Sequence, residues 1–317
     1  MSDAVLNKQS EDFLRQALPV FARHETFHPR FGWLKKGYDR TKQDPAIFLQ
    51  QDAPVTLGVG KNMVNAIRYW TQAFKLIEEA GESESKGTEY LPSDFGLNLL
   101  DDNGWDPYLE NLGSLWLLHW YLVKPVSIAA TWYFAFNAFS HIEFNSDEFL
   151  KELSDFRTLY FPRANAVEAS LKKDANCFLR MYAEGASNKK GVREESIDSP
   201  FIQLGLMQSH RSHHYQFNIG YKPTLPPEII VFACLDFAAM YSTGQTLKLD
   251  SLLFKPGSPG FVFRLNEASL CEAIEKVARK FKQVQYSEAA GLLQLSFQGD
   301  PKTLGHKLLN RYYKEQA

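Results

Sequence analysis

The segment PVTLGVGKNMVNAIRYWTQAFKLI, residues 54–77, decides the fold expected for the first third of the chain. Its glycines predict a tight turn, and the residues after them have the spacing of an amphipathic helix. Apolar side chains recur on one side of that helix, at Met63, Ile67, Trp70, Phe74 and Ile77. A short helix, a turn and a longer amphipathic helix in this order predict a helix-turn-helix motif.

The opposite side of the same helix has the composition of a DNA-reading surface. It carries two cations and two amides and no carboxylate: Lys61, Asn65, Arg68 and Gln72. Asn and Gln pair with adenine edges, Arg pairs with guanine, and Lys contacts phosphate. Because the second helix of such a motif enters the major groove, we expect these four residues and the neighbouring Asn62 to face DNA. The alternative is an ordinary surface helix with a polar outer face.

The flanking residues extend this motif to a winged helix. Residues 44–51, DPAIFLQQ, predict a short helix with an Asp cap and Pro at its first position. Residues 78–100 predict a short strand, a polar loop, a returning strand and a closing helix. Lys86 lies in that loop, so we expect it to contact DNA from the wing. The acidic residues at positions 78, 79, 82 and 84 argue against a wing that approaches phosphates.

The charge of the chain confines any DNA contact to a local patch. The 317 residues carry a net charge of -2, and the pI is about 6.5. A protein with this balance does not bind nucleic acid over its whole surface. Nine Lys and Arg residues and only four acids lie between Arg23 and Lys75. An excess of this size is typical of a DNA-contacting patch and equally of a solvated surface.

A second cationic stretch precedes the helix-turn-helix. In residues 21–39, FARHETFHPRFGWLKKGYD, aromatic and basic side chains alternate. Cations in such a pattern grip the DNA backbone while rings stack on bases, so we expect contacts from Arg30, Lys35 and Lys36. In the alternative, the aromatic side chains dock the chain start onto the core, and His24 and Glu25 pair with one another.

The rest of the chain predicts a helical region and a small C-terminal domain. The apolar residues 112–139 are interrupted by Lys124 and Pro125, which favours two buried helices over a membrane span. The polar residues 186–199 predict a linker. After it come a helix over residues 227–240, a strand followed by a helix in residues 261–281, and a final strand within residues 286–297.

We therefore expect an α+β, mainly helical protein. The predicted parts are a winged-helix DNA-binding domain, a helical region, a linker, and a C-terminal domain that is either α/β or winged-helix-like, over residues 1–103, 104–185, 186–199 and 200–317. Three widely spaced cysteines argue against a disulfide framework, and no signal-peptide pattern begins the chain. Both features favour the cytoplasm.

Known catalytic motifs are absent from the sequence. No phosphate-binding P-loop, nucleophile elbow or HExxH pattern occurs. The cluster His210, His213 and His214 has no carboxylate or Cys beside it, so we expect a polar loop there and no metal site. Asp174 stands next to Lys172 and Lys173, which predicts a surface ion pair.

Two strings, HETFHPRFGWLKKGYD (residues 24–39) and LGVGKNMVNAIRYWTQAFKLI (residues 57–77), resemble a bacterial family, number four thousand and seven among the domains of unknown function. Looser matches lie at residues 171–182, 196–206 and 257–267, so the resemblance covers about residues 20–313. That family is similar to the SspB component of single-strand DNA phosphorothioation defence systems.

The resemblance implies a protein that engages DNA and nicks one strand, so that sulfur can enter the backbone. The partners it implies are a cysteine desulfurase, an ATP-pyrophosphatase-like enzyme and an ATPase. His24 and Glu25 are the candidate catalytic residues, because they lie in a specific string beside the expected DNA-binding module. The cofactor is left open, with Mg²⁺ or Mn²⁺ expected if the protein is a nuclease. The alternative is a non-catalytic winged-helix adaptor that brings partner enzymes to DNA.

Overall fold

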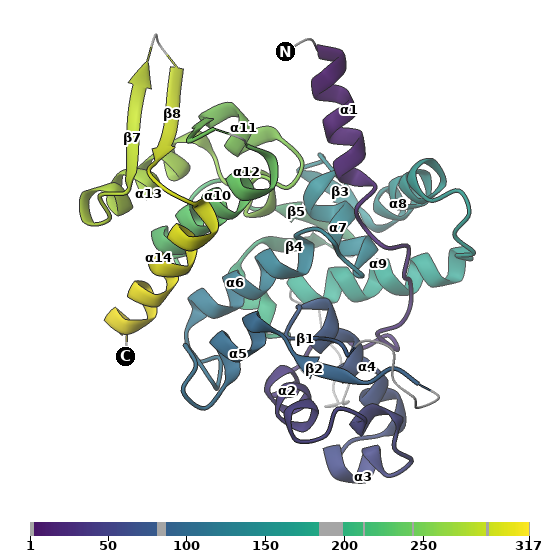
Figure 1. The fold of residues 1–317 in the computed structure, drawn as a ribbon. Helices are drawn as coiled ribbons and strands as arrows, with labels where there is room; N and C mark the ends of the chain where they lie inside the picture. Colours follow the sequence, from purple (N-terminus) through teal and green to yellow (C-terminus); the bar gives the residue numbers. More distant parts are fainter. Residues whose placement is uncertain are drawn as a thin grey trace.

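The computed structural model describes residues 3–80, 87–183, 199–211, 213–242, 244–289 and 292–316. Helices dominate this part of the chain, and the strands form three small antiparallel sheets (Figure 1). The expectation of a mainly helical α+β protein is confirmed. None of the helices in the described ranges is long and apolar enough to cross a membrane.

The N-terminal unit, residues 33–92, contains the helix-turn-helix segment. Its elements and their neighbours are α1 (Asp3–Leu14), α2 (Trp33–Gln43), the 3-10 helix η1 (Ile47–Leu49), α3 (Ala53–Leu57), α4 (Lys61–Ala73), β1 (Ile77–Glu79), β2 (Tyr90–Pro92) and α5 (Asp94–Leu100). Gly58 ends α3 in the left-handed conformation (φ 63°), which a glycine adopts without strain. The predicted order of elements is confirmed, although residues 44–51 form only one 3-10 turn. Lys86 lies outside the described residues.

The apolar side of α4 holds the N-terminal unit on the rest of the protein. Ile67 and Trp70 of α4 are fully buried, as is Phe74, the residue that caps its end. The helix is shorter than predicted, because Ile77 begins β1. Helix α2 crosses α4 closely at Gly37, where an added Cβ would lie 2.3 Å from Thr71 Oγ1. The two helices can therefore pack this closely only because residue 37 has no side chain beyond a hydrogen atom.

The middle of the chain begins with two buried helices on either side of Lys124 and Pro125, as predicted. Its elements are α6 (Leu112–Val123), α7 (Ala130–Asn137), β3 (Glu143–Asn145), α8 (Ser146–Tyr160), α9 (Glu168–Tyr182), the 3-10 helix η3 (Pro200–Leu204), β4 (Met207–Arg211) and β5 (His214–Phe217). The predicted linker, residues 186–199, lies outside the described residues except for Ser199. We call residues 130–217 the middle unit.

The C-terminal unit, residues 227–297, corrects two expectations. Its elements and the final helix are α10 (Pro227–Tyr241), β6 (Thr246–Lys248), α11 (Leu249–Phe254), α12 (Pro259–Val262), α13 (Glu267–Lys280), β7 (Val284–Ala289), β8 (Leu292–Phe297) and α14 (Pro301–Gln316). The expected strand before α13 is the short helix α12, because the Ser258 side chain caps its first turn and Pro259 favours a helix start. The expected single strand after α13 is the hairpin of β7 and β8.

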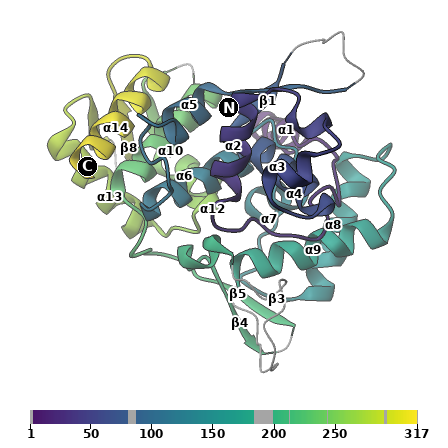
Figure 2. The ribbon, with the colours of Figure 1, turned by 90° about the horizontal axis from the view of Figure 1, so that it is seen from below.

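One order of elements recurs in all three units. The middle and C-terminal units each run from a helix to a strand, then through further α-helices to a two-stranded hairpin. The helices before the hairpin are α8 and α9 in the middle unit and α11, α12 and α13 in the C-terminal unit. The sheets have the orders β3-β5-β4 and β6-β8-β7. In the N-terminal unit, Pro45 takes the place of the first strand, since its carbonyl accepts from the Tyr90 amide at 3.0 Å. The three hairpins lie at the periphery of the molecule and point in different directions (Figures 1 and 2).

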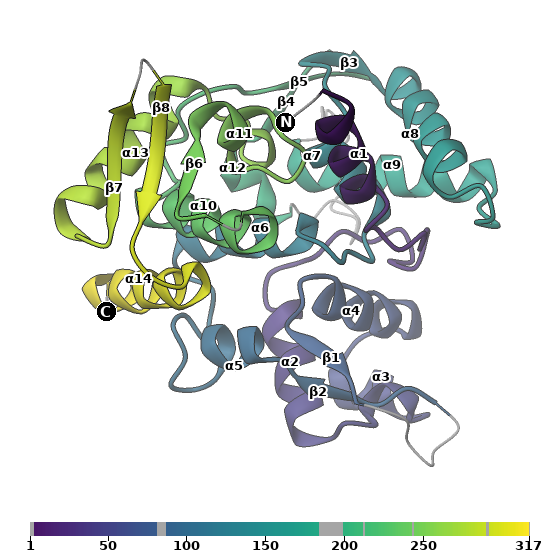
Figure 3. The same ribbon diagram turned by 45° about the horizontal axis from the view of Figure 1, so that its top comes forward.

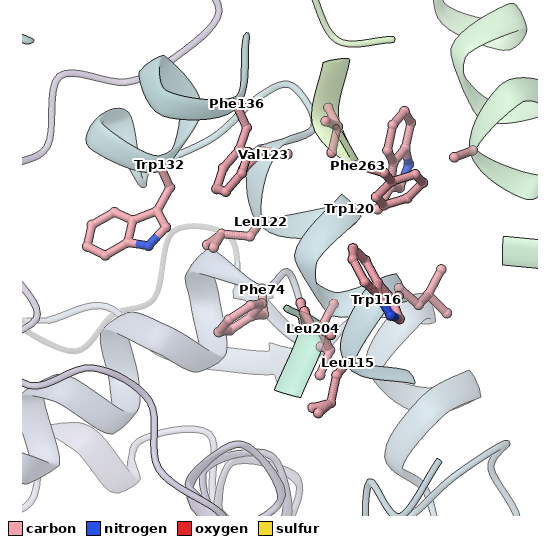
Figure 4. Packing of buried hydrophobic residues seen from close by; sticks show 14 of the residues in the cluster. Phe74, Leu115, Trp116, Trp120, Leu122, Val123, Trp132, Phe136, Leu204 and Phe263 are labelled. Carbon is pink, nitrogen blue, oxygen red and sulfur yellow. The ribbon is translucent and has the colours of Figure 1, made fainter. Parts of the chain in front are cut away.

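A shared aromatic core joins these units. Trp116 and Trp120 come from α6, and Trp132 and Phe136 come from α7, as the close view shows (Figure 4). Phe74, directly after α4, belongs to the same buried cluster. Figure 3 shows α6 between the C-terminal helices and the N-terminal unit. The boundaries expected near residues 103 and 185 stay predictions.

Gly37→Ala is expected to lower the free energy of unfolding by about 1–3 kcal/mol, because the new methyl group overpacks the contact of α2 with α4. Gly60→Ala is the control, since no atom lies within 4 Å of its added Cβ and its φ is -66°. There the lower entropy of the unfolded chain and the poorer helix cap nearly offset each other. Urea unfolding measures both, and equal stabilities for the two variants would contradict the close approach.

Candidate nucleic-acid interface

Helix α4 presents the predicted polar stripe outward. Lys61 and Asn62 at its start are exposed, whereas Asn65, Arg68 and Gln72 are partly exposed. Lys61, Asn65, Arg68 and Gln72 are spaced by four, three and four residues, so they form one row along the helix. Elsewhere on α4 seven residues are buried, which leaves this row as the surface that a ligand can reach.

The two amides of this row contact carboxylates of the same protein. Asn65 Nδ2 donates to Glu25 Oε1 at 3.4 Å, and Gln72 Nε2 donates to Glu79 Oε1 at 3.2 Å. In the described part of the chain, neither Lys61 nor Arg68 forms an ion pair within 4.0 Å. Within the described residues, Lys61 and Arg68 are thus available to an anionic partner. Asn65 and Gln72 would have to release their carboxylate partners before they could bind a base.

The two lysines before the helix-turn-helix already have partners within the protein. Lys35 Nζ lies 2.8 Å from Asp39 Oδ1 and 2.9 Å from the Leu100 carbonyl oxygen. Lys36 Nζ donates to the carbonyl oxygen of Leu57, the last residue of α3. These contacts stabilise the N-terminal unit, so a phosphate contact would compete with them.

The aromatic residues of this stretch divide between the core and the surface. Trp33 is buried, while Phe31 is 60% exposed. The Arg30 guanidinium lies over the rings of Phe27 and Trp33, at 5.4 and 5.1 Å from their centroids. The Trp70 indole donates to the Phe27 carbonyl oxygen at 2.9 Å. This chain start is therefore docked on α4, with Arg30 and Phe31 at its outer edge.

His24 lies in the core and pairs with Asp174 of α9. Both residues are fully buried, and His24 Nε2 lies 2.8 Å from Asp174 Oδ1. Asp174 also accepts hydrogen bonds from the Ala22 amide at 2.7 Å and the Thr131 hydroxyl at 2.9 Å. The expected surface ion pair of Asp174 is therefore wrong, because α9 turns this carboxylate inward and its two lysines outward. The suggested pairing of His24 with Glu25 does not form.

Glu25 lies beside this buried pair but remains partly exposed. It belongs to residues 22–26, which we call the bridging segment. Three of its residues, Ala22, Glu25 and Thr26, have left-handed φ values of 57°, 50° and 66°. Residues other than glycine adopt this conformation at a cost of about 1–3 kcal/mol each, and such strain is common at functional sites.

The histidine cluster occupies the β4–β5 hairpin. His210, His213 and His214 are exposed, and His210 contacts Gln208 and Gln216 on the same hairpin. Across the described ranges, no three His, Cys, Asp or Glu side chains form a group that could hold a metal ion.

Comparisons with known proteins place the chain in a family. A family model described as "Protein of unknown function (DUF4007)" matches residues 21–313. The chain belongs to the DUF4007 family. This confirms the resemblance carried by residues 24–39 and 57–77. A search of the curated proteins found no match.

Two solved structures are similar to this DUF4007 protein. They are described as "Magnesium ion-bound SspB crystal structure" and "SspB crystal structure", and each is 41% identical with a TM-score of 0.89. The first comparison covers 95% of this chain and 90% of the other. The second covers 96% of this chain and 90% of the other.

The electrostatics of the buried pair can be measured through its pH dependence. Burial by itself lowers the pKa of His24, but the neighbouring Cys177 and Asp174 outweigh burial and raise the pKa to about 10, from an ordinary value of 6.5. Because folding raises the pKa of His24, its protonated ring stabilises the folded state fully below pH 6.5. This stabilisation is lost as the pH rises towards 10.

Asp174→Asn is expected to lower the free energy of unfolding by about 3–5 kcal/mol at pH 6, because it leaves a buried imidazolium without its counter-ion. The difference in the free energy of unfolding between this variant and the wild type should become smaller between pH 6.5 and 10. Asp155→Asn changes an exposed carboxylate on α8 and should stay within about 0.5 kcal/mol. Urea unfolding at several pH values tests this, and a difference independent of pH would contradict the paired charge.

Proposed function

We propose that this protein is a DNA-binding component of a DNA phosphorothioation defence system, and that its N-terminal unit docks on duplex DNA as a winged helix. The observation that carries the proposal is the outward row on α4, whose cations Lys61 and Arg68 have no carboxylate partner in the described residues. The order of α3, turn, α4 and hairpin supports the same docking mode. The 41% identity to SspB supports the assignment to this kind of system.

Within this proposal, α4 enters the major groove with its first turn leading. Recognition helices contact base edges mainly through their N-terminal residues, which here are Lys61, Asn62 and Asn65. Arg68 lies one turn further along and reaches either a guanine edge or a phosphate. A cysteine desulfurase, an ATP-pyrophosphatase-like enzyme and an ATPase are the proposed partners in the system.

Arg68→Ala is expected to weaken binding to a 30-base-pair duplex by about 1–3 kcal/mol if Arg68 reads a base. The loss should then depend on the DNA sequence, whereas a phosphate contact gives the same loss on every duplex. Fluorescence anisotropy measures both cases. Arg279→Ala on α13 is the control, because Arg279 pairs with Glu275 of the same helix. Unchanged binding by the Arg68 variant at low salt would show that α4 is not the DNA-contacting surface.

We further propose that the protein nicks one strand, with Glu25 as the residue that acts on DNA. Glu25 is partly exposed in a strained segment beside the α4 row, which supports this role. The buried His24 reaches no solvent in this conformation, so it is a positioning residue within the proposal. It holds the bridging segment through Asp174.

A magnesium ion is compatible with this site. One SspB structure is described as magnesium ion-bound. Mg²⁺ is commonly held by one or two carboxylates, with water and substrate phosphates as the remaining ligands. Glu25 could supply such a carboxylate, and the ion would stabilise the negative charge that develops at the cleaved phosphate.

Glu25→Gln is expected to slow conversion of supercoiled plasmid to open circles by about 10²-fold or more in Mg²⁺ or Mn²⁺. The substitution keeps the shape of the side chain and removes only its charge. Gln72→Ala, at the far end of the α4 row, is the control for altered DNA contact. Nicking at the wild-type rate by the Glu25 variant would remove Glu25 from the proposed mechanism.

A non-catalytic adaptor is the second candidate function. It is favoured by the burial of His24 and by the lack of a three-ligand metal group in the described ranges. Wild-type protein that binds duplex DNA but leaves supercoiled plasmid intact, with either metal present, would support this candidate.

A further inference from the structure

Helix α9 occupies the same place in the middle unit that α4 occupies in the N-terminal unit. Each is the last α-helix before the two-stranded hairpin of its unit, with the 3-10 helix η3 between α9 and β4, and each follows a shorter or equally long helix and a turn. The sheet of the middle unit has the order β3-β5-β4, in which the first strand pairs with the third. If α4 is the recognition helix of its unit, α9 is the equivalent helix in the next one.

The outer face of α9 resembles the α4 row in its cations and its amide, and it also carries one exposed acid, Glu168, in its first turn. Four exposed side chains share it: Lys172, Lys173, Asn176 and Arg180. At about 100° per residue these four lie within roughly 100° of arc, and Asp174 lies about 160° or more from Asn176 on the buried side. In the described ranges Lys172 and Lys173 form no ion pair within 4.0 Å. The face therefore carries three cations and one acid, and within the described ranges its two lysines have no carboxylate within 4.0 Å.

The bridging segment fixes this face next to the α4 row. Arg180 Nη2 donates to the Thr26 carbonyl oxygen at 2.7 Å, and the adjacent Glu25 contacts Asn65 of α4 at 3.4 Å. The two helices thus meet neighbouring residues of one short segment. On the buried side, the His24 ring packs on Tyr69 and Trp70 of α4 while it pairs with Asp174 of α9. These contacts hold the two polar faces in one arrangement.

The third equivalent helix, α13, differs in its charges. Two of its three cations pair within the helix, Lys276 with Glu272 at 2.6 Å and Arg279 with Glu275 at 3.7 Å, and its three acids balance its three bases. A face of alternating acids and bases repels phosphates as much as it attracts them. The recurring unit therefore supplies two cationic faces and one neutral face.

We propose that α9 is a second DNA-contacting helix, and that one duplex spans α4, the bridging segment and α9. This inference rests on the proposed DNA binding and extends its footprint from one unit to two. Lys172 and Lys173 contact backbone phosphates, because ammonium groups without a fixed fork recognise phosphate as point charges. Glu25 then faces the DNA between the two helices, where a strand would pass closest to it.

The test compares the double variant Lys172→Ala/Lys173→Ala with Lys276→Ala/Arg279→Ala on a 30-base-pair duplex over a series of salt concentrations. Each phosphate contact contributes about 0.9 to the slope of log affinity against log salt, so the α9 variant should lose about 2 from that slope. Its hydroxyl-radical footprint should also shorten. The α13 variant should match the wild type in both measurements. Circular dichroism confirms that the exposed substitutions leave the fold intact.

The outcomes separate this inference from the proposed function. Wild-type binding that is weakened by Arg68→Ala, with an unchanged slope and footprint for the α9 variant, overturns the inference and leaves DNA docking by α4 in place. It would assign the α9 face to an acidic protein partner. An equal decrease of the salt slope in the α9 and α13 variants also overturns the inference, because it would indicate nonspecific attraction between DNA and any surface cation. If the wild type shows no salt-dependent DNA binding, both the inference and the proposed function are overturned.

Discussion

The buried carboxylate of Asp174 is the constraint on which the arrangement of this protein depends. An ionised group in a core is tolerated only when hydrogen bonds and an opposite charge replace its water shell. Here the Ala22 amide, the His24 ring and the Thr131 hydroxyl supply them. These donors come from the bridging segment and from α7, so satisfying one carboxylate fixes two parts of the chain relative to α9.

This constraint also separates charge on the surface. Helix α9 turns Asp174 inward and its lysines outward, and α4 turns Ile67, Tyr69 and Trp70 inward and its cations outward. A chain with a net charge of -2 thereby presents two cationic faces close together. For a DNA-binding protein this arrangement matters more than the overall balance, because phosphates respond to the local field within a Debye length.

The bridging segment connects these faces to the chemistry proposed for the protein. Its left-handed residues are held by Asp174 at Ala22, by Asn65 at Glu25 and by Arg180 at Thr26, so the packing of α4 and α9 maintains the strain. A carboxylate held in this way has a defined position before any ligand arrives, which is what a catalytic or positioning group requires. Within the proposed function, the same segment gives the buried His24 a positioning role without contact with a substrate.

The sequence by itself determined the local features of this protein. The glycine turn, the apolar side of α4 and its polar row follow from helical periodicity, and the specific strings identified the family. Only the tertiary structure decided which charges face water. Lys35, Lys36 and Asp174 look like surface residues because neighbours in sequence suggest it, yet each also has a distant partner. These partners are the Leu100 and Leu57 carbonyl groups, 65 and 21 residues away, and the His24 ring, 150 residues away. Such contacts depend on how the units pack, and periodicity within one helix carries no information about them.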